Sequence, residues 1–228
     1  MGLIGNIYGF LGFYNHSRGK KDKALELYAK GYEKGITNPN YQMAYGVLLL
    51  RSGQFQEAQD IFTKLLIYFP SNKLVKNNGK INLALTYWKL GDIDTAVERL
   101  SEVHSRLKNS KTYGTLGYLL LETGNFERAL KFNLDAMEYD NTDPVVLDNV
   151  AQTHYRMGDI EEAFTYFKRA KEVKDDQADT LYYLGCIYQQ KGQTEEAREV
   201  LEKALTCNIS ALSTISKKNI EDKLKEIG

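Results

Sequence analysis

Apolar and small residues recur along this chain at the spacing of one helical face, in blocks separated by short glycine-containing turns. Residues 179–208 show the pattern clearly, with such side chains at Leu181, Leu184, Gly185 and Tyr188, then at Ala197, Leu201, Ala204 and Leu205. Gly192 stands between the two sets, where a positive φ angle would close the first helix. Thr194 follows as the expected cap of the second helix. The block therefore predicts two antiparallel helices joined by a tight turn.

The same block repeats along the chain. A glycine is followed five residues later by an alanine six times, and successive glycines are 34, 38, 33, 34 and 34 residues apart. The six pairs are Gly19/Ala24, Gly53/Ala58, Gly91/Ala96, Gly124/Ala129, Gly158/Ala163 and Gly192/Ala197. One helix pair is too small to bury its own apolar face, so neighbouring pairs must stack to make a common core. We therefore expect an all-α array of six antiparallel helix pairs.

The first helix of each block also carries a small residue at one phase. These residues are Gly12, Gly46, Ala84, Gly117, Ala151 and Gly185. A glycine inside a helix is destabilising by about 1 kcal/mol relative to alanine. Such a loss is tolerable where it lets a partner helix approach closely, and we expect close approach at all six positions.

With these positions in place, the chain resembles the tetratricopeptide-repeat family, whose pattern runs W-x2-L-G-x2-Y and then G, A, F, A and P. The matches in the first helices include Tyr8-Leu11-Gly12, Leu83-Ala84-Tyr87, Tyr113-Leu116-Gly117 and Leu184-Gly185-Tyr188. Asn133 departs from the pattern, since the family usually has an aromatic residue there. The resemblance implies a right-handed α-solenoid that binds proteins or peptides.

The period divides the chain into one solenoid domain and a tail. The domain covers residues 1–210, with repeats at about 5–37, 39–71, 77–109, 110–143, 144–177 and 178–210. The third repeat starts four residues late, so we expect the Asn- and Lys-rich residues 71–79 to form a hinge or irregular joint. Apolar positions on one side of residues 211–228 predict a C-terminal capping helix over the last repeat.

The resemblance also implies that the first helices line a concave groove that holds a partner protein or peptide. Projecting the repeat register onto that groove selects residues in which aromatic anchors alternate with amide and basic groups. They are Phe13, Met43, Val47, Asn78, Asn82, Leu85, Trp88, Lys89, Lys111, Tyr118, Asn149, Gln152, Tyr155 and Tyr182. The alternative is that some of the aromatic side chains pack against the neighbouring repeat.

Chaperone-binding members of the family hold an acidic C-terminal tail with a clamp of Lys, Asn, Asn, Lys and Arg across three repeats. The corresponding residues here are Met43, Val47, Asn82, Lys111 and Thr115, of which two match. We therefore expect no binding to acidic chaperone tails.

Charge balance and motifs argue against several classes of function. The chain has 30 basic and 30 acidic side chains, whereas a nucleic-acid-binding protein usually shows a basic excess. His16, His104 and His154 lie in different repeats without metal-ligand spacing, and the sequence has no HExxH motif, P-loop or nucleophile elbow. We predict a protein that is not an enzyme, with no cofactor, no metal and no nucleic-acid partner.

The cysteines and the lack of targeting patterns bear on location. Cys186 and Cys207 have no metal-type pairing, and two unpaired cysteines suit a reducing compartment. The sequence shows no secretory signal with a basic start and no apolar run long enough to span a bilayer. We therefore predict a cytoplasmic protein.

Residues 1–17 contain no charged side chain, and apolar residues crowd both sides of the expected helix. Arg18, Lys20, Lys21 and Lys23 follow directly. An apolar helix beside a basic cluster can dock on a second copy of the chain or lie in a membrane interface. Simple packing on the second repeat is the interpretation we favour, and Tyr8, Leu11 and Gly12 fit it. A self-associating or membrane-peripheral assembly protein is thus the alternative to a peptide-binding scaffold, with a homo-oligomer favoured over membrane contact.

Overall fold

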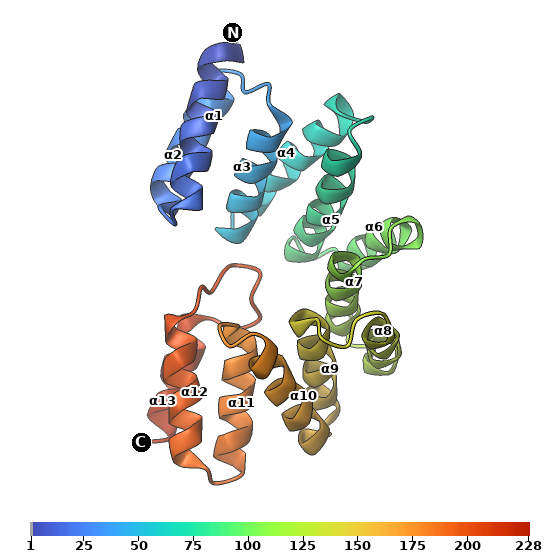
Figure 1. The fold of residues 1–228 in the computed structure, drawn as a ribbon, viewed down its shortest axis with the longest axis vertical. Coiled ribbons are helices and arrows are strands. Elements are labelled where there is room, and N and C mark those ends of the chain that lie inside the picture. Colours follow the sequence, from blue (N-terminus) through green and yellow to red (C-terminus); the bar gives the residue numbers. More distant parts are fainter. Residues whose placement is uncertain (1) are drawn as a thin grey trace. The chain divides into compact units, whose positions relative to one another are not determined.

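The computed structural model describes residues 2–228 and, within them, thirteen helices and no strand (Figure 1). The fold is an all-α solenoid of paired helices, as the sequence predicts. The helices are α1 (Gly2–Ser17), α2 (Lys21–Glu33), α3 (Pro39–Arg51), α4 (Phe55–Tyr68), α5 (Lys73–Lys89), α6 (Ile93–Arg106), α7 (Ser110–Glu122), α8 (Phe126–Tyr139), α9 (Pro144–Met157), α10 (Ile160–Val173), α11 (Ala178–Gln190), α12 (Thr194–Thr206) and α13 (Lys217–Glu226). Odd-numbered helices up to α11 are the first helices of the six pairs, and even-numbered helices are the second.

A glycine closes the first helix of every pair. The φ angles of the six predicted turn glycines, Gly19, Gly53, Gly91, Gly124, Gly158 and Gly192, all lie between 73° and 93°. Gly158, for example, is the left-handed C-cap of α9, and its N–H group donates to the carbonyl of Tyr155 at 3.2 Å. A side chain at such a φ angle is strained, whereas glycine adopts it freely. The turns predicted from the period are therefore confirmed.

The small residue of each first helix stands sixteen residues before a buried residue of the second helix. The six combinations are Gly12/Tyr28, Gly46/Phe62, Ala84/Leu100, Gly117/Asn133, Ala151/Phe167 and Gly185/Leu201, and every second member is fully buried. A Cβ atom on Gly12, Gly46 or Gly185 would lie 2.5–2.7 Å from the opposing side chain, which is closer than real Cβ contacts. The predicted close approach is confirmed at these glycines.

Asn133 is the polar exception among these buried residues. Its Nδ2 atom donates a hydrogen bond to the carbonyl of Gly117 at 3.4 Å. Its Oδ1 atom is buried and has no hydrogen-bond partner among the residues that the structure describes. The departure from the family pattern therefore leaves an unsatisfied acceptor inside the α7–α8 pair.

Several first helices begin at a polar cap followed by proline. Asn38 and Asp143 accept hydrogen bonds from first-turn N–H groups, and Pro39 and Pro144 occupy the first helical position, where no donor is lost. The prediction that Thr194 caps α12 is wrong. Thr194 is the first residue of that helix, and the preceding Gln193 is its N-cap without a side-chain capping bond.

The predicted hinge at residues 71–79 is also wrong, because most of this segment is helical. The Asn72 side chain accepts a hydrogen bond from the Val75 N–H group at 3.1 Å, and α5 begins at the next residue, Lys73. The extra residues lengthen α5 to 17 residues and bury Val75 and Gly79. The extra residues before the third repeat are therefore taken up as an additional, partly buried turn of α5, and no irregular joint forms.

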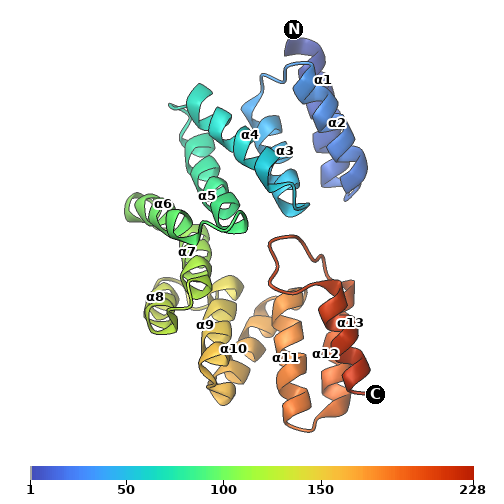
Figure 2. The same cartoon turned by 180° about the vertical axis from the view of Figure 1, so that it is seen from behind.

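The C-terminal helix is shorter than the predicted helix over residues 211–228. Ser216 and Asn219 form a capping box, so α13 starts at Lys217, and residues 207–216 form an irregular segment before it. Figure 2 shows α13 beside α12, and the two helices are in contact. Ile215 and Ile220 are buried in the same cluster as Leu201 of α12. The tail therefore covers the apolar face of the last pair.

The chain divides into two compact units, residues 1–103 and residues 104–228. The first, called unit 1 below, contains α1 to α5 and most of α6. The second, unit 2, contains the end of α6 and α7 to α13. A single solenoid domain over residues 1–210 stays a prediction, and the candidate site residues are described unit by unit.

Candidate functional site

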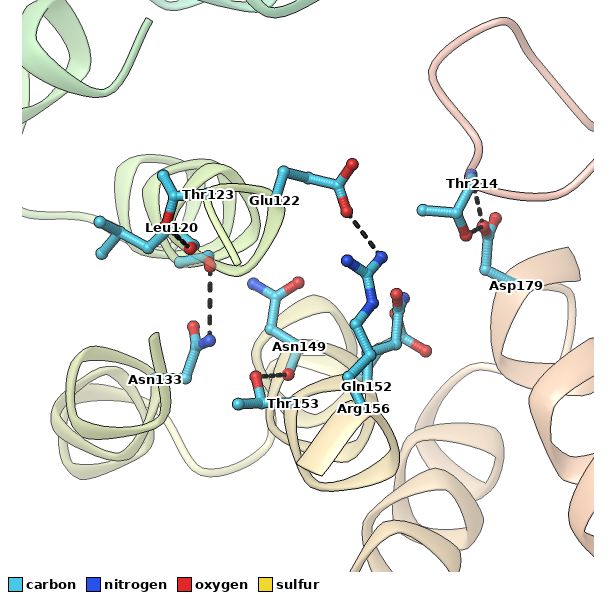
Figure 3. Close-up of polar contacts among 12 residues, drawn as sticks. Leu120, Glu122, Thr123, Asn133, Asn149, Gln152, Thr153, Arg156, Asp179 and Thr214 are labelled. Carbon is cyan, nitrogen blue, oxygen red and sulfur yellow. Dashed lines mark hydrogen bonds and ion pairs between the residues drawn. The ribbon is translucent and has the colours of Figure 1, made fainter. Parts of the chain in front are cut away.

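In unit 2, the first helices α7, α9 and α11 bring together residues about one repeat apart in sequence (Figure 3). The guanidinium of Arg156 donates to Glu122 Oε1 at 2.6 Å, across a separation of 34 residues. Asn149 Nδ2 donates to the carbonyl of Gly114 at 2.8 Å, across a separation of 35 residues. The repeat period therefore sets which side chains meet between neighbouring first helices.

Two of the predicted groove residues in unit 2 lie in the interior. Asn149 and Gln152 of α9 are only 1% and 2% exposed. Asn149 uses its amide to hold the backbone of α7, and Gln152 Nε2 donates to Asp148 Oδ2 at 2.6 Å. The Asn149 amide therefore contacts the neighbouring helix α7, and the Gln152 amide contacts a carboxylate of its own helix. Asn149 and Gln152 are therefore too buried to contact a bound partner directly.

Asp148 is the buried carboxylate beneath this surface. It accepts hydrogen bonds from the Thr180 hydroxyl on α11 and from Gln152, both at 2.6 Å. Burial raises its pKa to about 7, and the nearby carboxylate of Asp179 adds to the shift, while the two hydrogen bonds oppose it. Desolvation outweighs the two hydrogen bonds because no cation is among the groups that shift the pKa of this carboxyl. Asp148 thus joins α9 to α11 through hydrogen bonds.

The irregular segment before α13 is held against α11 by another carboxylate. Asp179, near the start of α11, accepts hydrogen bonds from both the backbone N–H group of Thr214, at 2.8 Å, and the Thr214 hydroxyl (Figure 3). This anchor places Thr214 and Ile215 beside the exposed side of α11. The segment therefore forms one wall of the pocket described next.

A pocket of about 400 Å³ opens on unit 2 between α9, α11 and the C-terminal tail. Its lining includes three aromatic rings: the Tyr183 ring centroid lies 5.0 Å from that of Tyr155 and 5.5 Å from that of Tyr182. The lining is Tyr155, Tyr182, Tyr183, Cys186, Gln189, Gln190, Thr214, Ile215, Asn219 and Lys223. The structure thus brings together Tyr155 and Tyr182, which the repeat register assigned to the groove.

The electrostatics of this pocket favour neutral, hydrogen-bonding ligands. Burial raises the pKa of the Tyr155 and Tyr182 hydroxyls, which therefore stay protonated at neutral pH. Burial also raises the pKa of the Cys186 thiol, so less of it is thiolate at neutral pH and it reacts slowly with electrophiles. Lys223 donates to Gln189 at 3.2 Å and pairs with Glu226, so its charge is already compensated.

The candidate residues of unit 1 form two local groups. Asn82 on α5 is buried and donates through Nδ2 to Met43 Sδ on α3 at 3.6 Å. At the end of α5, Lys89 Nζ lies 4.1 Å from the centre of the Trp88 ring. Val47, Asn78 and Leu85 are half-buried on the same two helices. Met43 and Asn82 therefore contact each other between α3 and α5, and the Asn82 amide is largely covered.

The remaining candidates lie apart from these groups. Phe13 on α1 is half-exposed, and its ring centroid lies 6.1 Å from that of Tyr41 on α3. Lys111 at the start of α7 is exposed. Tyr118 on α7 is half-buried, and burial, together with Glu122, raises the pKa of its hydroxyl. The fourteen predicted residues therefore do not form one exposed row.

Reasoning from the sequence missed Tyr183, Cys186 and Lys223, which complete the pocket. Tyr183 and Cys186 lie on α11, one and four residues after Tyr182, the α11 position that the register assigned to the groove. Lys223 lies in the tail, which the repeat pattern does not cover. The repeat period could have pointed to Lys223. It lies 34 residues after Gln189, and Arg156 lies 34 residues after its partner Glu122, so side chains one period apart come into contact.

Within residues 2–228, the structure shows no group of three or more His, Cys, Asp or Glu side chains arranged to hold a metal ion. No helix in the same range combines the length and the apolar character needed to cross a membrane.

Comparison with known families identifies the repeat. One tetratricopeptide-repeat family model matches residues 144–209, which include the helices α9 to α12, and a second matches residues 79–102. This chain is a tetratricopeptide-repeat protein. Proteins of this family generally bind other proteins, and their fold is typically a non-catalytic scaffold. The family match thus favours a role in protein binding.

The curated relatives that match this chain are longer proteins. A TPR repeat-containing protein of Methanocaldococcus jannaschii is 28% identical over 157 residues, covering 68% of this chain. The CTR9 homologue of Arabidopsis thaliana is 24% identical over 207 residues, covering 85% of this chain. This tetratricopeptide-repeat protein spans 27% and 18% of those two relatives, respectively.

Solved structures share the fold at low sequence identity. A tetratricopeptide-repeat protein from Parabacteroides merdae matches with a TM-score of 0.81 and 17% identity, over 98% of this chain and 84% of that one. The APC/C hetero-tetramer Cut9–Hcn1 matches with a TM-score of 0.72 and 19% identity, over 97% of this chain and 42% of that chain. Both likenesses concern the fold alone.

Proposed function

We propose that this protein is a scaffold whose unit 2 holds a peptide or protein segment along α9 and α11, with one side chain of the partner inserted into the tyrosine-lined pocket. The pocket itself carries the proposal, because it is concave and lies on first helices. Tyrosine rings supply contact area at a low entropic cost, since each has few rotatable bonds.

The chemistry of the lining favours an apolar or aromatic anchor flanked by backbone hydrogen bonds. Gln189, Gln190 and Asn219 add side-chain amides to the lining. The oxygens of Gln189 and Asn219 already accept hydrogen bonds from Lys223 and Ser216, so these two amides offer their NH2 groups as donors. Lys223 is already paired, so an acidic side chain gains little there. This preference agrees with the predicted lack of binding to acidic chaperone tails.

A substitution in the pocket tests this proposal. A peptide selected from a display library on the full chain should bind Tyr182→Ala at least about tenfold more weakly, because truncating an aromatic anchor typically costs more than 1 kcal/mol. Tyr68→Ala is the matched control, since Tyr68 is a highly exposed tyrosine on α4, outside the pocket. Kd values from calorimetry measure both. Equal loss in the two variants, or none in either, would contradict the assignment of the pocket.

The two cysteines provide a direct footprint of the same site. Cys186 lines the pocket, whereas Cys207 is half-buried after the end of α12 and is not part of the lining. Bound peptide should slow maleimide labelling of Cys186 while labelling of Cys207 keeps its rate. Protection of both thiols alike would indicate general stabilisation rather than occupancy of the pocket.

The proposed role is binding rather than catalysis, which the family and the fold support. We place the protein in the cytoplasm, because its two cysteines are free and a reducing compartment keeps thiols in that state.

A second candidate function is favoured by a separate observation in unit 1. Several large apolar side chains of the uncharged helix α1 are exposed, including Leu3, Ile7 and Phe10. Such a face supports self-association, or contact with a membrane surface, through residues 1–17.

A further inference from the structure

Helix α1 turns its small residues inward and its large apolar residues outward. Gly5, Gly9 and Gly12 are its buried residues. Figures 1 and 2 both show α1 beside α2, and the two helices are in contact. An ordinary amphipathic helix shows the reverse arrangement, with large apolar side chains in the core. The arrangement of α1 therefore needs an explanation beyond packing within unit 1.

The inward face leaves no room for larger side chains. A Cβ atom on Gly5 would lie 2.6 Å from the backbone of Gly35, and one on Gly12 would lie 2.7 Å from the Tyr28 ring. A Cβ atom on Gly31 of α2 would lie 3.0 Å from the Gly5 carbonyl oxygen, so the two helix backbones are close. Rotation of α1 about its axis would drive Leu, Ile or Phe side chains into these gaps. The glycines thus hold the apolar residues on the outside.

The outward residues form a regular seam along the helix. Leu3, Ile7, Phe10 and Tyr14 are 77%, 51%, 54% and 48% exposed, and they follow one another at intervals of four, three and four residues. This spacing is that of the apolar seam in a coiled coil, in which one helix packs along another. Ile4 and Leu11 are also exposed and flank the seam. At its C-terminal end, the Arg18 guanidinium lies over the Tyr14 ring at 5.3 Å.

We propose that α1 of one copy packs antiparallel against α1 of a second copy, an inference that rests on the second candidate function. The helix has no charged side chain, so pairing with itself buries no unpaired charge. The basic residues Arg18, Lys20, Lys21 and Lys23 follow its C-terminal end. An antiparallel arrangement places each basic cluster beside the neutral start of the partner helix, whereas a parallel one brings the two clusters together.

The size of the seam suits such a dimer. The seam runs over residues 3–14, roughly three helical turns, so two copies can contact each other along most of α1. The regular four-three-four spacing favours a helix as occupant over a flat lipid surface, which requires no such register. The pair is isologous, because Leu3 of each copy lies against Tyr14 of the other.

The mass of the full chain in solution tests the pairing. Sedimentation equilibrium over a concentration series should give twice the 26.0 kDa of one chain for the wild type and a single chain for Ile7→Glu/Phe10→Glu. The matched control is Ile67→Glu/Tyr68→Glu on α4, whose side chains are similarly exposed at 65% and 70%, and it should stay dimeric. Circular dichroism should report the same helicity for all three, which shows that each variant is folded, and the monomeric variant should melt at a lower temperature because it lacks the stabilisation from pairing. A monomeric wild type, or a dimeric Ile7→Glu/Phe10→Glu variant, would overturn the proposal.

Cross-linking tests the antiparallel register separately. In a Cys186→Ala/Cys207→Ser background, a short bismaleimide should join Leu3→Cys chains to Tyr14→Cys chains in a mixture. It should give little dimer from either variant alone. Predominant cross-links within each single variant would overturn the antiparallel arrangement while leaving self-association in place.

Vesicle flotation tests whether a membrane surface, rather than a second copy of the chain, covers the seam. The wild type and the Ile7→Glu/Phe10→Glu variant should both stay unbound to vesicles of phosphatidylcholine and phosphatidylserine. A monomeric wild type that floats with the vesicles, while the variant does not, would assign the seam to a membrane surface instead. Neither result bears on the pocket of unit 2, whose test uses peptide binding.

Discussion

Asp148 shows how one buried polar side chain affects the protein at the residue scale. Its carboxyl lies between α9 and α11, where it accepts hydrogen bonds from Thr180 and Gln152. Gln152 Oε1 is buried nearby without a hydrogen-bond partner in the described part of the chain. The two donors favour the carboxylate, but burial, helped by the nearby Asp179, outweighs them and raises the pKa to about 7, which favours a protonated carboxyl below that pH.

The raised pKa of Asp148 predicts a stability that falls with pH. Between pH 4 and 7 the unfolded state releases the proton, whereas the folded state keeps it up to its pKa of about 7. The folded state therefore binds more protons, and the free energy of unfolding decreases through this range and levels off above it. Asp148→Asn should remove the decline and raise the free energy of unfolding at pH 7 by about 1–3 kcal/mol, because its amide can donate to Gln152 after the Gln152 amide flips.

Urea unfolding at about pH 4.5, 6 and 7.5 measures this effect. These pH values roughly cover the range between the ordinary pKa of an aspartate in the unfolded state and the raised pKa of Asp148 in the folded state. Asp135→Asn, an exposed carboxylate on α8, is the control and should keep the wild-type pH dependence. A steeper decline in Asp148→Asn than in the wild type would contradict a protonated Asp148.

At the scale of the helix pair, stability depends on the buried side chain of the second helix that packs against the small residue of the first helix. The space left by the missing or small side chain is called the gap of that pair. Five of the six gaps are filled by Tyr, Phe or Leu, and the α7–α8 gap is filled by Asn133. In the α11–α12 pair, Leu201 fills the same position opposite Gly185. Because Gly117 also lacks a Cβ atom, the α7–α8 gap should accept a leucine as well.

Asn133→Leu should therefore stabilise the protein. The substitution removes a buried acceptor without a partner and adds apolar contact, which together are worth about 1–3 kcal/mol. For a chain of this size, each kcal/mol raises the melting temperature by roughly 2–4 °C. Thermal unfolding followed by circular dichroism measures the shift. Lys131→Leu on the exposed side of α8 should leave it nearly unchanged, and a lower melting temperature for Asn133→Leu would show that its hydrogen bond to Gly117 is needed.

The sequence could predict the features that are set by a single residue, but not those that depend on helix caps or on contacts between helices. The turn glycines were predictable because a positive φ angle is a property of one residue. The start of α5 and the late start of α13 were not, because they depend on caps at Asn72 and Ser216, which a repeat pattern does not register. The burial of Asn149 also escaped prediction, since it depends on how closely α9 approaches α7.

At the scale of the whole molecule, the two proposed surfaces belong to different units. The seam lies on α1 in unit 1, and the tyrosine-lined pocket lies on α9, α11 and the tail in unit 2. Contacts in a repeat protein are mostly between neighbouring repeats, so each unit keeps most of its own core. The pocket could be predicted only in part, because its second wall comes from the tail outside the repeat pattern. Separate units imply that binding and pairing can be removed one at a time.

A fragment of residues 104–228 provides the last prediction. It keeps His104, whose ring centroid lies 4.4 Å from that of Tyr113 and 5.3 Å from that of Phe132, and it keeps the tail that covers α12. We expect it to fold cooperatively, to bind the selected peptide with a Kd within about threefold of the full chain, and to sediment as a monomer because α1 is absent. Circular dichroism, calorimetry and sedimentation equilibrium measure the three properties. A folded fragment that does not bind would show that unit 1 contributes to the peptide site, and a dimeric fragment would place the pairing surface outside α1.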